Sequence, residues 1–144
     1  MNIPVLVLLG FAAWTLLTLS VTVGVYRWRR ILTGRSSIAE WRADLPQCSE
    51  WYQRGIRSHM NCVENLPVYT AIVLAIIATG SHGVMLDRLA VAILAARMGQ
   101  TLVHITLPPT NSAAALRFAL YFVQVACMLA MAGLVAPAAA IELS

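Results

Sequence analysis

The sequence predicts an all-α integral membrane protein, an antiparallel bundle of four transmembrane helices. Of its 144 residues, 60% are hydrophobic and only 11% are charged, which is too apolar for a soluble domain of this size. A bilayer core about 30 Å thick requires about 20 apolar residues per helix. Uncharged stretches of that length cover residues 1–26, 65–86 and 118–141, and a fourth, over 89–116, is interrupted only by Arg97. Four such spans with short connections use nearly the whole chain, so we expect one domain over residues 1–144.

The distribution of arginine predicts the orientation of the spans. The chain contains no lysine, and seven of its ten arginines lie between Arg27 and Arg57, so the positive-inside rule places this connection in the cytoplasm. This topology accounts for the net charge of +4, and nucleic acid is not needed to explain it. The N-terminal stretch lacks the basic start of a cleaved signal peptide, so we expect the first span to be retained. Abundant Ala and Arg without Lys are typical of a GC-rich bacterial genome, and we therefore predict a bacterial inner membrane.

Helix boundaries can be assigned from caps and breakers in the first half of the chain. The first helix is expected from Pro4, which suits a first helical position, to the arginine cluster at 27–30. The segment Gly34 to Glu50 mixes charges with tryptophan and is predicted to be a cytoplasmic loop near the membrane interface. The second helix is expected from about Glu50 to Thr79, with a bend at Pro67, whose missing N–H removes a helical hydrogen bond.

The second half of the chain carries similar signals. Residues 81–83 are predicted to turn the chain into the third helix, which should end before Pro108. Residues 110–112 offer N-caps for the fourth helix, because Thr, Asn and Ser side chains accept hydrogen bonds from a first turn. Gly133 and Pro137 are expected to mark the end of that helix.

The three cysteines are expected to be reduced and mostly structural. Cys48, Cys62 and Cys127 have no metal-type spacing and leave an odd thiol under any pairing. The sequence therefore predicts no metal site.

Polar residues form a stripe on each of the last three predicted helices. Residues three or four apart share one helix face, and in an antiparallel bundle these three stripes should converge at one depth, toward the cytoplasmic leaflet. The second helix carries Arg54, Arg57, Asn61 and Glu64; the third carries Arg97, Gln100, Thr101 and His104; the fourth carries Arg117, Tyr121 and Gln124.

Each of these residues also has a purely structural interpretation. Arg54 near a helix end can extend to the headgroups, and Tyr121 can belong to an aromatic belt. Glu64 can form a structural ion pair with Arg57 or Arg97, and His104 is more often an interfacial histidine than a ligand. Against this, a charged side chain at membrane depth costs roughly 2.5–3.5 kcal/mol on insertion scales, so such residues should face the bundle interior and be paired.

The second polar stripe also carries a family resemblance. The run from Arg57 to Tyr69, RSHMNCVENLPVY, closely resembles the second-helix signature of the membrane-associated proteins in eicosanoid and glutathione metabolism, the MAPEG family. The chain length and the four spans agree, and within the family the chain is similar to the microsomal glutathione transferases. The resemblance implies a homotrimer that binds glutathione between adjacent subunits near the cytoplasmic side.

The resemblance also implies roles for individual residues. Arg117 corresponds to the fourth-helix arginine that activates the thiol, and it is the predicted catalytic residue. The predicted glutathione-binding residues, with Arg54 and His104 added from the stripes, are Arg27, Arg30, Arg54, Arg57, Asn61, Glu64, Arg97, His104 and Tyr121. Three positions depart from the family pattern. Met98 and Leu102 replace tyrosines of the leukotriene synthase, and Phe118 replaces a serine of the prostaglandin synthase.

The chemistry of glutathione fits such a site. The tripeptide carries two carboxylates, an ammonium and a thiol, so several arginines and one glutamate complement its charges. The thiolate is the nucleophile, and a free thiol with a pKa near 8.5 is only a few per cent ionised at neutral pH. Lowering that pKa by about two units requires about 2.7 kcal/mol of preferential thiolate stabilisation, which one arginine in a partly dry pocket could provide.

Three functions are compatible with the sequence. The first is a glutathione transferase or glutathione-dependent peroxidase acting on lipophilic electrophiles that arrive through the membrane. The second is a non-catalytic scaffold that binds a lipid or glutathione, as the lipoxygenase-activating protein of the family does. A four-helix multidrug exporter is the weakest, because the first helix lacks the carboxylate that such exporters carry there.

Overall fold

The computed structural model describes residues 2–40 and 49–142, and within these ranges every regular element is a helix. The first span consists of α1 (Ile3–Thr18), a π-helical segment η1 (Leu19–Gly24) and α2 (Val25–Leu32), followed by the short 3-10 turn η2 (Ile38–Glu40). The remaining helices are α3 (Glu50–Ala78), α4 (Val84–Thr106) and α5 (Asn111–Glu142). Among the described residues, four helical spans are long and apolar enough to cross a membrane, so the predicted all-α fold with four spans is confirmed and the protein is a multi-pass integral membrane protein.

The helix starts depend on side-chain caps. Asn2 accepts a hydrogen bond from the Val5 N–H at the start of α1, where Pro4 lies in the first turn. The Ser49 hydroxyl accepts the Tyr52 N–H ahead of α3, and the Thr110 hydroxyl accepts the Ala113 N–H ahead of α5. The predicted cap within residues 110–112 is therefore present.

The turn between α3 and α4 falls where the sequence predicted it. Gly80 has a φ of +60°, a conformation that a side chain would disfavour. The Ser81 N–H donates to the Ile76 carbonyl at 3.1 Å, and the Gly80 N–H donates to the Ile77 carbonyl at 3.3 Å. This is the Schellman pattern, which satisfies the last carbonyls of α3 and reverses the chain.

The predicted end of the last helix is wrong. α5 continues through Gly133 and Pro137 to Glu142. A proline removes one helical N–H and crowds the carbonyl four residues earlier, here that of Gly133, and a helix can accommodate both by a local bend. Alanine, the strongest helix former, occupies 136 and 138–140 and favours continuation of the helix beyond the proline. Pro67 likewise lies inside α3, as predicted.

The first span departs from a regular α-helix, which the sequence analysis did not predict. Within and before η1, the hydroxyls of Thr15, Thr18 and Thr22 each donate to the carbonyl four residues earlier, at 2.6–2.9 Å. Such bonds compete with the backbone and are associated with helix distortion. Gly55 of α3 lies against this segment, since a Cβ there would be 2.7 Å from the Thr22 Cβ. The close contact sets the position of the start of α3.

The core lies along the centre of the bundle and draws on all four spans. Phe11 of α1, Tyr69 of α3, Ile93 of α4 and Met131 of α5 are fully or almost fully buried. The Tyr69 hydroxyl donates to the Pro4 carbonyl at 3.1 Å, which joins α3 to the start of α1. By contrast, only 22–39% of each hydrophobic span is buried within the chain. The remaining apolar surface is suited to lipid.

Two further predictions concern the interfacial loop and the cysteines. Residues 41–48 of the predicted interfacial loop, including Cys48, lie outside the described residues. Cys62, which is buried, and Cys127, which is half-buried, are free thiols, as predicted.

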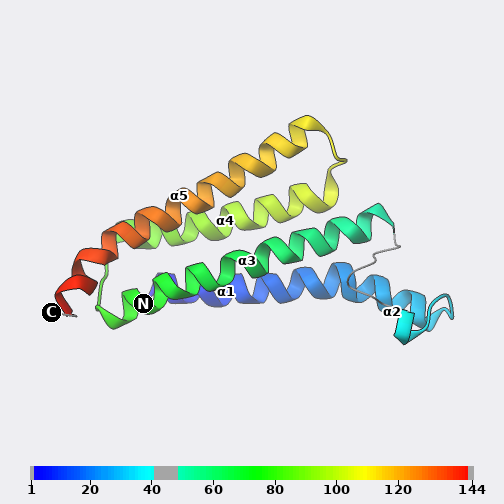
Figure 1. The fold of residues 1–144 in the computed structure, drawn as a ribbon, viewed down its shortest axis with the longest axis horizontal. Helices are drawn as coiled ribbons and strands as arrows, with labels where there is room; N and C mark the ends of the chain where they lie inside the picture. Colours follow the sequence, from blue (N-terminus) through cyan, green and yellow to red (C-terminus); the bar gives the residue numbers. More distant parts are fainter. Residues whose placement is uncertain (1, 41–48, 143–144) are drawn as a thin grey trace.

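The antiparallel order of the helices brings distant parts of the chain together. The start of α3, the end of α4 and the start of α5 lie at the same end of the bundle, and α2 extends beyond that end (Figure 1). Side chains from the three polar stripes can therefore meet there.

Candidate functional site

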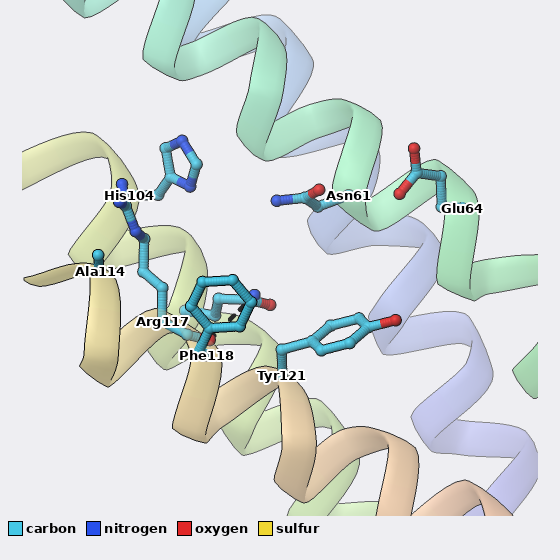
Figure 2. Close-up of a pocket in the computed structure, with 8 residues that line it drawn as sticks. Asn61, Glu64, His104, Ala114, Arg117, Phe118 and Tyr121 are labelled. Atoms are coloured by element: carbon cyan, nitrogen blue, oxygen red, sulfur yellow. Dashed lines mark hydrogen bonds between the residues drawn. The ribbon is translucent and has the colours of Figure 1, made fainter. Parts of the chain in front are cut away.

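A pocket opens between α3, α4 and α5 near this end of the bundle (Figure 2). It has a volume of about 330 Å³, at the lower end of the usual range for small-molecule sites. Its lining residues are Asn61 and Glu64 from α3, Gln100 and His104 from α4, and Ala114, Arg117, Phe118 and Tyr121 from α5. Five of the ten predicted site residues are therefore brought to one pocket: Asn61, Glu64, His104, Arg117 and Tyr121.

The charges in the pocket are separated along its length. Arg117 extends toward His104, while Glu64 and the Tyr121 hydroxyl lie on the other side, and the Asn61 amide projects between them from α3 (Figure 2). Arg117 lines this end of the pocket together with His104, so this end carries a positive charge. The pocket thus offers a positive end and a single carboxylate to a ligand.

The Glu64 carboxylate is not neutralised by an ion pair. Within residues 2–40 and 49–142, no arginine nitrogen lies within 4.0 Å of its oxygens, and its side chain is exposed. The structural ion pair with Arg57 or Arg97, which the sequence left open, does not form in this chain. A charged ligand group can therefore approach Glu64.

Arg97 is the main difference from the expected site. Its side chain is only 1% exposed and does not line the pocket. It lies beneath the wall, where its NH1 donates to Gln100 Oε1 at 2.9 Å and its guanidinium carbon is 5.6 Å from the centre of the Phe11 ring. Gln100 Nε2 in turn donates to the Arg117 carbonyl at 3.3 Å.

Gln100 and Gln124 were not among the predicted site residues. Gln100 lines the pocket, and Gln124 Nε2 donates to Gln100 Oε1 at 3.1 Å. Both already lay on the polar stripes, three residues after Arg97 and Tyr121. A glutamine on the polar face of an otherwise apolar helix was the signal that could have identified them.

Four predicted arginines lie outside this pocket. Arg27 Nε donates to the Tyr52 hydroxyl at 2.7 Å, and Arg30 NH1 donates to the Tyr26 hydroxyl at 3.3 Å. Arg54 NH1 donates to the Leu107 carbonyl at 2.8 Å, so it ties the start of α3 to the residue that caps α4. Arg57 is exposed. Within one chain these residues do not line the pocket with Arg117.

The fold and the pocket define a small four-span membrane protein with a charged site at one end of the bundle. The sequence profile of the MAPEG family matches residues 5–137, and the chain belongs to this family. Membership indicates a membrane function in glutathione or eicosanoid metabolism. No curated protein and no solved structure matches the chain.

Proposed function

We propose that this protein is a membrane-bound glutathione transferase, or a glutathione-dependent peroxidase, that acts on lipophilic electrophiles. The observation that carries the proposal is the separation of charge in the pocket between the Arg117 and His104 end and the unpaired Glu64. A tripeptide that carries both carboxylates and an ammonium is complementary in sign to the two ends of this pocket.

Each pocket residue has a role in this proposal. Arg117, half-buried at the pocket wall, stabilises the thiolate, which attacks the electrophile when glutathione is bound. Glu64 accepts hydrogen bonds from the ammonium, and the Asn61 amide and the Tyr121 hydroxyl bind the peptide groups between the two ends. His104, at the same end of the pocket as Arg117, binds a carboxylate.

The electrophile would enter from the bilayer. Phe118 and Tyr121, which line the pocket on α5, are 75% and 44% exposed on the side of the bundle. An apolar molecule dissolved in the membrane can therefore reach the pocket along aromatic side chains without crossing the cytoplasmic end. This supports a lipophilic second substrate.

The proposal includes a homotrimer in a bacterial inner membrane, with the site toward the cytoplasm. Glutathione would then lie between adjacent subunits, as the family resemblance implies. The position of Arg27, Arg30 and Arg57 outside their own pocket is consistent with contacts to a neighbouring subunit's ligand. The orientation is supported by the seven arginines between residues 27 and 57.

The test is conjugation of glutathione to a generic aromatic halide by the purified protein. At pH 7 we expect activity in the wild type and the loss of most of it in Arg117→Ala, with the oligomer intact. Arg88→Ala is the matched control, because Arg88 is exposed near the opposite end of the bundle and should leave conjugation unchanged. Full activity in Arg117→Ala would remove this residue from the catalytic role.

A non-catalytic scaffold is the second candidate. It is favoured by Met98 and Leu102, which are apolar and exposed on α4 and supply no hydroxyl where the leukotriene synthase of the family carries tyrosines. Calorimetry separates the two candidates. Glutathione or lipid binding without turnover over several classes of electrophile would favour the scaffold.

A further inference from the structure

A buried polar cluster lies directly beneath the pocket. Arg97, Gln100 and Gln124 are 1%, 6% and 0% exposed, and all three lie inside membrane-spanning helices. An ionisable residue at such depth is expensive, and one that is retained usually has a specific role. Because Arg97 is closed off from the pocket, a ligand in the pocket cannot contact its guanidinium group directly.

Gln100 is the hydrogen-bond partner on which Arg97 depends. Arg97 NH1 donates to Gln100 Oε1, whereas the Nε and NH2 groups of Arg97 find no acceptor in the part of the chain that the structure describes. The Phe11 ring adds a cation–π contact. Glu64 lies too far away to form an ion pair.

The donors and acceptors of these side chains determine the orientation of the Gln100 amide. Arginine has only donors, so Gln100 must turn its oxygen toward Arg97. Gln124 Nε2 donates to the same oxygen at 3.1 Å and also to the Leu120 carbonyl at 2.9 Å. With its oxygen held by two donors, Gln100 must direct its amide N–H toward α5, where it reaches the Arg117 carbonyl at 3.3 Å.

We propose that Arg97 is a positioning residue, which acts through Gln100 to hold the turn of α5 that presents Arg117 to the glutathione thiol. This inference rests on the proposed function and gives Arg97 a different role from direct ligand contact. The hydrogen bond to the Arg117 carbonyl fixes the backbone from which the Arg117 side chain projects. A misplacement of about 1 Å can reduce catalysis by up to ~100-fold, so a small loss of order in this turn is sufficient for a measurable effect.

The test uses four variants of the full-length protein in detergent: Arg97→Met, Gln100→Met, the double variant, and Arg97→Lys. Two properties are measured for each: the affinity for glutathione by calorimetry, and the fraction of bound glutathione present as thiolate by ultraviolet absorbance. We expect Arg97→Met and Gln100→Met each to lower the thiolate fraction at neutral pH by about tenfold, within the range for a misplaced group, with little change in affinity. Arg97→Lys retains a donor for the Gln100 oxygen and should restore much of the thiolate signal.

The double variant distinguishes positioning from direct contact. If Arg97 acts through Gln100, the double variant loses no more thiolate than the more severe single variant, because both changes interrupt the same chain of hydrogen bonds. Additive losses, or a large fall in glutathione affinity confined to Arg97→Met, would overturn the inference. Absence of glutathione binding in the wild type would instead refute the proposed function itself.

Tyr69→Phe is the control for general destabilisation. It removes a buried side-chain hydrogen bond, to the Pro4 carbonyl, that is not part of the cluster. It should lower the thermal midpoint without changing the thiolate fraction. If Tyr69→Phe lowered the thiolate signal as much as Arg97→Met does, the effect would be one of stability alone and the inference would fail.

Discussion

Gly55→Ala tests the contact that positions the start of α3. A Cβ at residue 55 would lie 2.7 Å from the Cβ of Thr22 and 2.9 Å from its Oγ1. Rotation of the Thr22 side chain can move the oxygen but not the Cβ, and carbon atoms pack best at about 3.5–4.0 Å. α3 and η1 would therefore have to separate by roughly 1 Å.

The expected magnitude combines two effects. Overpacking typically costs about 1–3 kcal/mol, whereas replacing a helical glycine by alanine stabilises by up to about 1 kcal/mol. We therefore expect Gly55→Ala to be about 0–3 kcal/mol less stable than the wild type. Gly133→Ala is the matched control, because no atom lies within 4 Å of the Cβ it would add to α5. The difference between the two variants isolates the overpacking effect.

The assay is reversible unfolding in mixed micelles, followed by circular dichroism. Gly55→Ala should be less stable than Gly133→Ala by about 1–3 kcal/mol. Adding Thr22→Gly to Gly55→Ala should recover part of the lost stability, because it removes the opposing Cβ. If Gly55→Ala proved as stable as Gly133→Ala, the close approach of these two helices would be refuted.

Three further predictions concern the site and its supports. If Arg117 lowers the pKa of the glutathione thiol by about two units from ~8.5, the bound thiol is mostly ionised at any pH above the lowered pKa. Arg117→Ala should then reduce conjugation roughly 25-fold at pH 7 but less than about twofold at pH 9, where a free thiol is also mostly ionised. An equal loss at both pH values would contradict thiolate stabilisation. Glu64→Gln removes the charge that faces the ammonium and should weaken glutathione binding by calorimetry, whereas a glutathione analogue without the amino group should bind both forms alike. Thr110→Ala removes the cap of α5 and should lower the free energy of unfolding by about 1 kcal/mol in the same micelle assay, and no change would show that the cap is dispensable.

Sequence reasoning located the fold because the signals were strong and local. Apolar stretches of membrane length, the Gly80 turn and the Thr110 cap each depend on a few adjacent residues. Pro137 misled the prediction of the last helix end, because a proline interrupts only one hydrogen bond and crowds only one carbonyl, and the surrounding alanines are strong helix formers that favour continuation. The π-helical segment depends on hydroxyl bonds within the first span, which hydropathy does not record.

The polar stripes predicted which helices form the site but not which group each side chain contacts. Helical spacing places Asn61, Glu64, His104 and Arg117 on faces that converge, and the structure brings them to one pocket. Spacing could not show that Arg97 turns away from the pocket to Gln100, or that Arg54 binds the Leu107 carbonyl. Those outcomes depend on the side-chain rotamers and the packing distance between helices, which a one-dimensional pattern does not contain.

The most direct test of the central claim is a structure of the membrane-embedded protein determined with glutathione bound. We expect the sulfur within hydrogen-bond distance of the Arg117 guanidinium group and the ammonium beside Glu64, in the pocket between α3, α4 and α5. Glutathione bound elsewhere, or with its sulfur far from Arg117, would contradict the account.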